Sequence, residues 1–498
     1  MSLPGFLEGS SGSQVTDSYF EWEGTKRPGK AKGLKIRYIV PLCGCPLPGS
    51  TSVRHSSCCG SKWLGSWLVE PLAITQRDSS VAKKKTTFRA VPYMGVAQAM
   101  VDASQFGYRS GRPDWCNLGQ GQPDVGRIEG APNRLTWITL EPHDHSYGPD
   151  GGIDELREAV ADHYNRLYRV GEDFRYKKEN VSIASGGRVM LSRIFSTFNS
   201  ISMGYKFPDS STYHDLFSHH LDRVKPLAVP VGSDESFRLD PARLGKVIAA
   251  KKLKAFLIGN PCNPTGDLIR NADLKAYLTA ARKNRCTLVM DESYSHYIYG
   301  EDGAPAEGPV SAAAYVRNVE KDPVVIVDGL SKNFRYPGWR LSWAVGPSSV
   351  IENLERAATG SDGGPSLPSQ RLAIKALDPE RADEETTAVR RLFAKKRNVM
   401  LEGLKSLGIR CEHAPRGTFY VWADLSGLPK PLNDAAAFFK AGLERKVVTL
   451  PGRFFDVNPG RTHPPMRELK KWVRFSFGIS EDKIRTGLER LEEMIEGV

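Results

Sequence analysis

From about Ala90 onward, the chain alternates short runs of aliphatic residues with longer stretches of helical period. Parallel strands need a long crossover connection, usually a helix, so this alternation is typical of repeated βα units. We therefore predict an α/β fold whose mostly parallel sheet is flanked by helices. The predicted strands are Val181–Ala184, Ala255–Gly259, Thr287–Met290 and Val324–Val327, and the helices between them include Asp154–Tyr168 and Leu274–Asn284.

Beyond about Pro365 the pattern changes. A long helical stretch, Glu384–Leu407, is followed by the strand-like pieces Thr418–Ala423 and Trp472–Phe477 and by a helix that begins near Glu481. This order predicts a smaller α+β domain packed on the large one. We divide the chain into an N-terminal extension over residues 1–89, a segment over 90–125 that packs on the small domain, a large domain over 126–364 and a small domain over 365–498.

The first 89 residues are rich in Gly, Ser, Pro and Lys and lack helical or strand periodicity, which predicts a poorly ordered extension. The extension is either a targeting arm or a stretch outside the functional protein. It carries 13 Lys and Arg against 6 Asp and Glu, which is more than half of the net charge of +12. The remaining basic excess is dilute and forms no stripe with aromatic residues, so we do not expect a nucleic-acid partner.

No apolar stretch reaches the roughly 20 residues that span a bilayer, and the first residues lack the basic and apolar regions of a secretory signal. We therefore expect a cytoplasmic protein without membrane contact. The eight cysteines are too few for a disulfide scaffold. Four of them lie near His55, but their spacing matches no paired CxxC pattern, so no metal site is predicted there. These four are Cys43, Cys45, Cys58 and Cys59.

Ligands of open α/β sheets bind beyond the carboxyl ends of the strands, so the polar residues that follow each predicted strand are the candidates for a site. After the first predicted strand come Ser185 to Arg188 and then a helical stretch. Small residues such as Gly187 at a strand-to-helix turn leave backbone N–H groups free to hold a phosphate at the helix N-terminus. A tight turn without a ligand is the alternative.

Two further predicted strands are also followed by polar residues. The run from Asn260 to Gly266 contains two Asn-Pro steps, which fix the Asn side chains, including Asn263, in a rigid bend. Asp291 and then Tyr294 follow the next predicted strand. A carboxylate buried at that position needs a cationic partner, and a helix cap is the alternative.

The last predicted strand is followed by Ser331 and Lys332, with Arg340 eight residues beyond the lysine. Lysine is almost never fully buried unless it is paired or reacting, and a desolvated lysine readily forms a Schiff base. A phosphate cradle, a fixed Asn, an acid, a lysine and an arginine are together what pyridoxal 5'-phosphate (PLP) requires. The sequence therefore predicts a site for this cofactor.

These motifs resemble those of the class I/II aminotransferases of the aspartate aminotransferase fold (fold type I), from about Asn117 to the C-terminus. The resemblance implies an enzyme that transfers an amino group between an L-amino acid and a 2-oxo acid, working as a homodimer with shared active sites. Further pieces follow in the family's order. Asn117–Pro123 resembles the substrate strand, Tyr147–Gly152 the segment that reaches into a neighbouring subunit, and Val473–Ser476 the strand with the carboxylate-binding arginine.

The resemblance also implies a role for each site residue. Lys332 would form the Schiff base with the cofactor and move the substrate proton, and Asp291 would keep the ring nitrogen protonated. Gly121, Asn263 and Arg474 would bind the substrate carboxylate. The other cofactor contacts would come from Asn263 and Tyr294 at the phenolate oxygen, from Gly187, Arg188, Ser331, Arg340 and a neighbouring subunit's Tyr147 at the phosphate, and from Tyr213 stacked on the ring.

Two residues depart from the family pattern. Gly329 stands where the family has a Ser or Thr that contacts the phosphate, so this contact is missing or is supplied by Ser331 or Arg335. Arg188 replaces a smaller residue, and we expect its side chain to reshape the rim of the cofactor or substrate site. Three roles keep a plain structural alternative, namely Tyr213 as a packed aromatic, Tyr147 as a turn residue and Arg474 as a surface ion-pair partner.

Two other functions remain open. A PLP-dependent lyase of the aminocyclopropane-carboxylate synthase-like or carbon–sulfur lyase-like type begins with the same deprotonation of the substrate Cα. A non-catalytic PLP-fold regulator is the third possibility, and the intact Lys332 and Asp291 count against it. The substrate itself is not specified, because side-chain specificity depends on loops whose arrangement the sequence does not reveal.

Overall fold

The computed structural model describes residues 87, 91, 93, 95–300, 303–306 and 308–498. The chain divides into two units, residues 1–86 and Thr87–Val498, and the fold below is that of the second. The predicted extension over 1–89, apart from Thr87, lies outside the described residues, as does the cysteine group near His55. Within the described part, no helix is long and apolar enough to cross a bilayer, and no group of three or more His, Cys, Asp or Glu side chains is placed to hold a metal ion.

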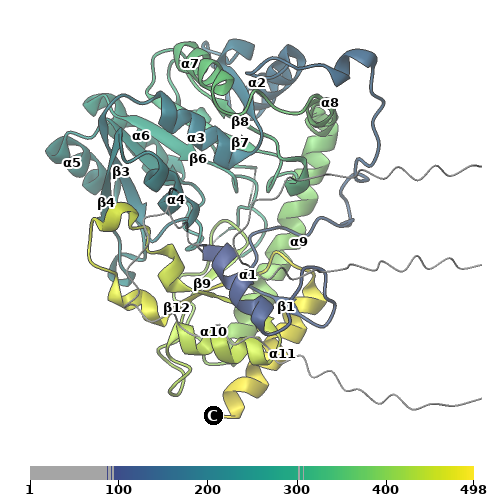
Figure 1. Ribbon diagram of the computed structural model, residues 1–498, viewed down its shortest axis with the longest axis vertical. Coiled ribbons are helices and arrows are strands. Elements are labelled where there is room, and N and C mark those ends of the chain that lie inside the picture. Colours follow the sequence, from purple (N-terminus) through teal and green to yellow (C-terminus); the bar gives the residue numbers. More distant parts are fainter. Residues whose placement is uncertain (1–86, 88–90, 92, 94, 301–302, 307) are drawn as a thin grey trace, which may run out of the picture. The chain divides into compact units, whose positions relative to one another are not determined.

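A seven-stranded sheet lies at the centre of the larger half (Figure 1), in the order β2-β8-β7-β6-β5-β3-β4. Strand β8 is antiparallel to both of its neighbours, and the other strands run in one direction. This confirms the predicted α/β fold with a mostly parallel sheet. The strands are β2 (Val181–Ala184), β3 (Ile201–Phe207), β4 (Val224–Pro230), β5 (Ala255–Gly259), β6 (Thr287–Asp291), β7 (Val324–Gly329) and β8 (Ser342–Val345).

Helices cover both faces of this sheet. Buried side chains of α2, α5 and α6 pack on one face, and those of α3, α4 and α7 pack on the other. The strands are apolar on both sides for this reason, with Phe256 of β5 facing the first layer and Leu257 the second. These helices are α2 (Asp154–Tyr168), α3 (Gly187–Thr197), α4 (Thr212–His219), α5 (Pro241–Lys251), α6 (Asn271–Asn284) and α7 (Ser348–Thr359).

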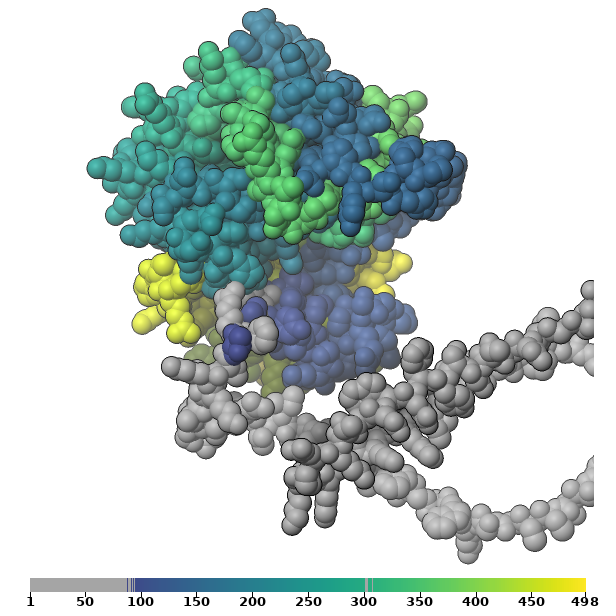
Figure 2. Space-filling view, turned by 45° about the horizontal axis from the view of Figure 1, so that its top comes forward, coloured from purple at the N-terminus to yellow at the C-terminus, as the bar shows by residue number. Residues whose placement is uncertain are grey.

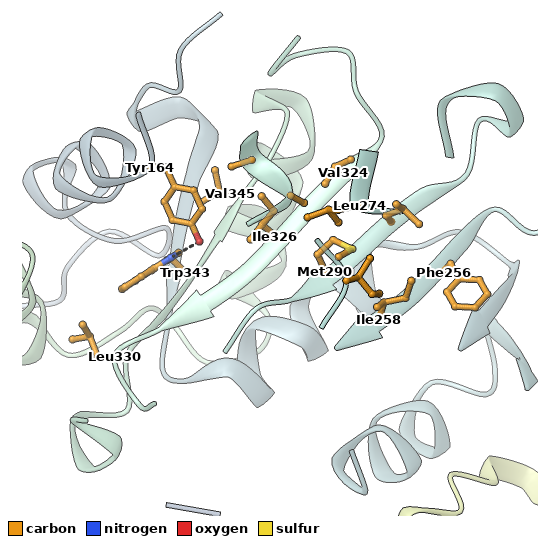
Figure 3. Close-up of a cluster of buried hydrophobic side chains, with 14 of the residues drawn as sticks. Tyr164, Phe256, Ile258, Leu274, Met290, Val324, Ile326, Leu330, Trp343 and Val345 are labelled. Atoms are coloured by element: carbon orange, nitrogen blue, oxygen red, sulfur yellow. Dashed lines mark hydrogen bonds between the residues drawn. The ribbon is translucent and has the colours of Figure 1, made fainter. Parts of the chain in front are cut away.

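The core under α2 and α6 is continuous across neighbouring strands. In Figure 3 the aliphatic side chains of β5, β6 and β7, among them Met290 and Ile326, lie side by side on this face. At the β8 end, the buried Trp343 indole N–H donates to the Tyr164 hydroxyl over 3.4 Å. Because each polar tip has a partner, two large aromatic side chains can be buried here without an unsatisfied donor.

The smaller half contains an antiparallel sheet in the order β11-β12-β9. Three helices pack their apolar residues against it, and the N-terminal segment joins it through strand β1, which pairs in parallel with β10. Figure 2 shows the purple N-terminal residues beside the yellow C-terminal ones. The domain boundaries proposed from the sequence stay predictions. The elements of this half and of the N-terminal segment are α1 (Gly95–Gln105), β1 (Cys116–Asn117), α9 (Pro379–Ser406), β9 (Tyr420–Asp424), α10 (Ala435–Glu444), β10 (Val447–Val448), β11 (Leu450–Pro451), β12 (Trp472–Ser476) and α11 (Glu481–Glu496). Helix α8 (Leu367–Ala376), which precedes α9, contacts α2 of the larger half.

Three strands of the large sheet are not indicated by the sequence pattern. Strand β3 is interrupted by Gly204 and Lys206, which are poor strand formers. Strand β4 contains Pro226 and Pro230, and it tolerates both because it is the edge strand of the sheet. Strand β8 is only four residues long and directly follows the turn that carries Arg340.

Two carboxyl groups are buried behind the carboxyl ends of β6 and β7. Glu292 is fully buried; its Oε1 accepts from the Ala312 N–H over 2.7 Å, and its Oε2 has no hydrogen-bond partner among the described residues. Asp328 accepts from its neighbour Gly329 and from the Asn333 amide over 2.7 Å. Burial raises the pKa of Glu292 to about 8 and raises the pKa of Asp328 well above its usual range. Glu292 is therefore protonated at neutral pH.

The raised pKa of Glu292 predicts a loss of stability with rising pH. The unfolded chain releases this proton near its ordinary pKa of 4.5, whereas the folded chain keeps it to about 8. The stabilising contribution is therefore complete below 4.5 and falls by up to about 1.4 kcal/mol per pH unit until the pH passes the folded pKa. The free energy of unfolding is measured with denaturant from pH 5 to 9. We expect it to fall less steeply with pH in Glu292→Gln than in the wild type, because the variant lacks this proton. Parallel slopes for the variant and the wild type would contradict it, and Glu412→Gln, at an exposed position, is the control.

Candidate active site

The predicted site residues of the large domain meet at the carboxyl ends of the parallel strands. Asp291 ends β6, Lys332 lies in the turn after β7, Asn263 lies in the loop after β5, and Gly187 begins α3 after β2. These strands point in the same direction, so the segments that follow them emerge side by side. The site lies where open α/β sheets bind their ligands.

Lys332 is partly buried at the centre of this group. Its Nζ donates to the backbone oxygen of Gly121, which belongs to the N-terminal segment. Burial, together with the positive charges of Arg340, Arg474 and Arg188, lowers the pKa of Lys332 to about 8. A substantial fraction of this amine is neutral near physiological pH, so the lysine can act as a nucleophile or base.

Asp291 is held by two hydroxyl donors. Its Oδ2 accepts from the Tyr213 hydroxyl over 2.9 Å, and its Oδ1 accepts from Ser293 Oγ over 2.6 Å. These bonds fix the orientation of the carboxylate. Asp291 is not a helix cap, since the next helix of the described chain begins only at Ala312. The Tyr213 ring is almost fully buried, and its observed contact is the one to Asp291; the stacking role stays a prediction.

Arg474 lies in β12 of the smaller half and is 1% exposed. It donates to Asn263 Oδ1 over 2.9 Å and to the Gly119 backbone oxygen over 2.5 Å, while its Nε has no partner among the described residues. Its guanidinium carbon lies 4.0 Å from the centre of the Tyr420 ring. The alternative of a surface ion pair is wrong, because the side chain is buried and forms no salt bridge within the described chain. Its contacts leave an unneutralised charge that is suited to a carboxylate.

Tyr420 is a site residue that the motifs did not reveal. Its hydroxyl lies 2.9 Å from that of Tyr294, and a Cβ on Gly121 would come within 3.5 Å of it. Burial raises the pKa of both phenols. Tyr420 is the third residue of the predicted strand-like piece Thr418–Ala423. Its polar hydroxyl within an apolar run was the signal in the sequence that could have identified it. It places a second phenol, beside that of Tyr294, next to the Arg474 side chain.

The turn before α3 forms a cradle for a phosphate. Gly186 has a φ of 103°, and a Cβ there would overlap the Arg340 guanidinium, so only glycine allows this approach. Space is open at Gly187, where no atom lies within 4 Å of a built Cβ. Arg340 also donates to Ser331 Oγ over 3.3 Å. The N-terminus of an eleven-residue helix, a hydroxyl and a guanidinium thus converge, as a phosphate ester requires.

A cavity of about 520 Å³ opens beside this cradle. One wall comes from α1 and the turn after it and is largely apolar, with Val96, Met100 and Tyr108. The other walls carry Gly121 and the exposed side chain of Arg188. The cavity is large enough for a small organic substrate next to the cradle.

A profile of the aminotransferase class I and II family matches residues 113–491. The chain belongs to this family. It is 30% identical to an LL-diaminopimelate aminotransferase of Halothermothrix orenii, over 76% of this chain and 90% of that protein. It is 29% identical to an aspartate aminotransferase of Sulfurisphaera tokodaii, again over 76% of this chain and 90% of that protein.

Solved structures show the same relationship. The chain superimposes with a TM-score of 0.66 on the aspartate aminotransferase from Thermus thermophilus with maleate, at 25% identity, over 82% of this chain and all of that chain. An aminotransferase from Mycobacterium tuberculosis gives the same TM-score at 24% identity. The prediction of an aminotransferase of class I/II with the aspartate aminotransferase fold is therefore confirmed, and this protein is an enzyme of the transferase class.

One predicted residue of the aminotransferase lies apart from the others. The Tyr147 side chain is fully exposed and hydrogen-bonds to none of the described residues. It follows a stretch with further exposed apolar side chains, Trp137 and Leu140. A single subunit therefore does not bring Tyr147 to the cradle, and its role at the phosphate of another subunit stays a prediction.

Gly329, the departure from the family pattern, has a steric reason in this aminotransferase. A Cβ at Gly329 would lie 2.6 Å from the Leu341 backbone oxygen and 2.6 Å from the Ser342 Cα. The start of β8 thus approaches β7 too closely for any side chain, and the adjacent Arg340 hydrogen-bonds to Ser331 instead. Arg335 does not compensate, because its guanidinium is bound by Glu385 and by backbone oxygens away from the cradle.

Restoring the family's hydroxyl at this position should destabilise the enzyme. We expect Gly329→Ser to lower the free energy of unfolding by about 1–3 kcal/mol, because backbone atoms of β8 must move to admit the side chain. Thermal and denaturant unfolding of the purified variant measure the effect. Gly360→Ala is the control, since no atom lies within 4 Å of a Cβ there. A Gly329→Ser enzyme as stable as the wild type would show that β8 moves aside without a cost in stability, which would contradict the prediction.

Proposed function

We propose that this enzyme is a PLP-dependent aminotransferase that moves an amino group between an L-amino acid and a 2-oxo acid, with Lys332 as its central catalytic residue. The observation that carries the proposal is a lysine whose pKa is lowered to about 8, placed between the phosphate cradle and the buried Arg474. When bound, PLP supplies an aldehyde that captures amines and a protonated ring that takes up electrons from the substrate Cα.

The residues present fit this cofactor. Its phosphate would lie on the backbone amides of Gly187 and Arg188, with Arg340 and Ser331 as side-chain donors. Its ring nitrogen would face Asp291, whose orientation is fixed by Tyr213 and Ser293. The phenolate oxygen would accept from Asn263 and Tyr294. The Asn263 amide N–H₂ is available for this, because its Oδ1 already accepts from Arg474.

Lys332 would move the substrate proton. Its neutral amine would accept a proton from the substrate Cα, and the resulting ammonium would hold that proton in the site and donate it again. The three nearby arginines that lower its pKa keep the neutral form available. The negative charge of Asp291 acts in the opposite direction and raises the pKa of Lys332, so the lysine still binds a proton.

Arg474 would bind the substrate α-carboxylate. Its observed partners, Asn263 Oδ1 and Gly119 O, are neutral oxygens, so the buried guanidinium carries an unneutralised charge. A carboxylate would neutralise that charge in a two-pronged contact, which would orient the Cα toward Lys332. A homodimer in which the partner's Tyr147 completes the phosphate site, and the cytoplasmic location expected from the sequence, are parts of this proposal.

Removing the amine at position 332 tests the proposal. We expect Lys332→Ala to lower the transamination rate by at least about 10⁴-fold, because proton transfer and covalent capture are both lost. The enzyme is assayed with a panel of amino donors and an added 2-oxo acid acceptor, and formation of a new amino acid from the acceptor distinguishes transfer from a lyase reaction, which would release ammonia instead. Lys275→Ala, at an exposed position on α6, is the control. Full activity of Lys332→Ala would end the proposal.

We further propose that substrates with an acidic side chain are preferred. The cavity carries Arg188 and Arg109, and no hydrogen bond or ion pair joins either side chain to an acidic group among the described residues. Several relatives are named aspartate aminotransferases, and one is named aspartate/prephenate aminotransferase. Arg188 is the closer of the two arginines to the reaction centre, since its charge acts on both Lys332 and Arg340.

Arg188 should therefore discriminate between amino donors. We expect Arg188→Met to lower kcat/KM for L-aspartate by about 10- to 100-fold, the value of a charge-assisted hydrogen bond, and to change kcat/KM for an uncharged donor by less than about threefold. Parallel kinetics with L-aspartate and L-leucine measure the ratio. Equal losses for both donors would show that Arg188 holds the cofactor rather than the substrate side chain.

A further inference from the structure

A second buried charged group lies next to Asp291. Lys206 at the end of β3, Asp209 in the following turn and Cys262 in the loop after β5 are each about 1% exposed. Lys206 Nζ donates to Cys262 Sγ over 3.0 Å. Neither the family motifs nor the proposed mechanism uses Lys206 or Asp209. A buried ammonium and a buried carboxylate in one place are costly unless they compensate each other.

The Asp209 carboxylate is only partly satisfied. Its Oδ1 accepts from the Ser210 N–H over 2.7 Å, and its Oδ2 has no hydrogen-bond partner among the described residues. Burial is the main effect on Asp209 and raises its pKa to about 7, while the Lys206 charge acts in the opposite direction. Asp209 thus exchanges its proton near physiological pH, and Lys206 is the cation that favours its charged form.

Asp209 is close to the bond that fixes Asp291. A Cβ built on Gly259 would lie 3.2 Å from the Tyr213 hydroxyl and 3.3 Å from Asp209 Oδ1, so both oxygens border the same point. The Tyr213 hydroxyl donates to Asp291. The negative charges of Asp291 and Asp209 both raise the pKa of the buried Tyr213 phenol, and the charge of Asp291 also raises the pKa of Asp209.

We propose that Asp209 is a positioning residue for the reaction: as a second buried anion behind Tyr213, kept charged by Lys206, it strengthens the hold of Asp291 on the proton of the cofactor ring nitrogen. This inference rests on the proposed PLP chemistry. Like charges in a poorly polarisable interior raise each other's proton affinity. A negative charge at Asp209 therefore favours a proton on the group that Asp291 contacts.

The groups around Asp209 come from several elements. Lys206 lies on β3, Cys262 and Asp267 lie on the loop after β5, Asp291 ends β6, and Tyr213 belongs to α4. Lys206 is the only cation among these groups. Removing Lys206 leaves Asp267, Asp291 and Asp209 without a compensating positive charge in this group, so Asp209 takes up a proton. The loss of Lys206 and the loss of the Asp209 charge should then act in the same direction at the ring nitrogen.

The test uses holoenzyme loaded with PLP labelled with ¹⁵N in the ring. In Asp209→Asn, which keeps the shape and removes the charge, we expect the pH at which the ¹⁵N shift reports loss of the ring proton to fall by about one unit. Lys206→Met should give a smaller shift in the same direction, and the double variant, which has the same net charge as Lys206→Met with a protonated Asp209, should match Lys206→Met. Lys225→Met, on the exposed side of β4, is the control.

The outcomes separate this inference from the proposed function. If wild-type protein binds PLP at Lys332 and both variants keep the wild-type ¹⁵N titration, Asp209 has no such role and the inference is wrong. If the wild-type protein binds no PLP, the proposed function itself fails. Should Asp209→Asn not fold, the double variant Asp209→Asn/Lys206→Met takes its place, because replacing both members of a buried charged pair is commonly tolerated. A purely structural role would lower the unfolding midpoint and leave the ¹⁵N titration unchanged.

Discussion

The site depends on gathering positive charges, the buried Arg474 among them, without pairing them with carboxylates. Lys332, Arg340 and Arg474 form no salt bridge with an acid among the described residues, and their direct acceptors are backbone, amide and hydroxyl oxygens. Neutral oxygens orient a cation but do not cancel its charge. The arrangement is therefore stabilised further by any anion that enters, and a phosphate and a substrate carboxylate are two such anions.

This arrangement exists only because three distant stretches of chain converge. Lys332 comes from the large sheet, its acceptor Gly121 from the N-terminal segment, and Arg474 from the smaller sheet. The bond between Arg474 and Asn263 joins the two sheets across the site itself. A displacement of one half against the other would change the position of the carboxylate-binding group relative to the lysine. Binding of a carboxylate and the relative position of the two halves are thus coupled through a single side chain.

The sequence revealed the residues that immediately follow recognisable strands. Asp291, Lys332 and Asn263 were found because β5, β6 and β7 are uninterrupted apolar runs, and parallel strands bring their ends together. The fold class followed from the same alternation. Strand β8 is short and follows a turn, so its close approach to Gly329 was invisible, and the missing hydroxyl there seemed a lost contact rather than a steric requirement.

Other residues depend on contacts that no spacing encodes. Tyr420 reaches the site because the smaller sheet folds back onto the large one, and Tyr213 meets Asp291 because α4 lies under the loop after β5. Strand β3 was not predicted, since a lysine such as Lys206 in an apolar run argues against a buried strand. The structure gives the reason for its presence: the turn after β3 carries Asp209, and a buried acid needs a cation nearby.

These groups give the site an uneven distribution of charge. The cations Arg340 and Arg474 form one group around Lys332, whereas the acids Asp291 and Asp209 form another, at the end of β6 and in the turn after β3. A planar ring between the two sides would have its proton-bearing nitrogen at the acidic side and its reactive carbon at the lysine. Negative charge that develops on such a ring is drawn toward a protonated nitrogen only while the acids behind it stay ionised. Lys206 is the one buried cation on the acidic side of the described site, and its position beside Asp209 rather than beside Asp291 leaves the catalytic carboxylate free to bind a proton donor.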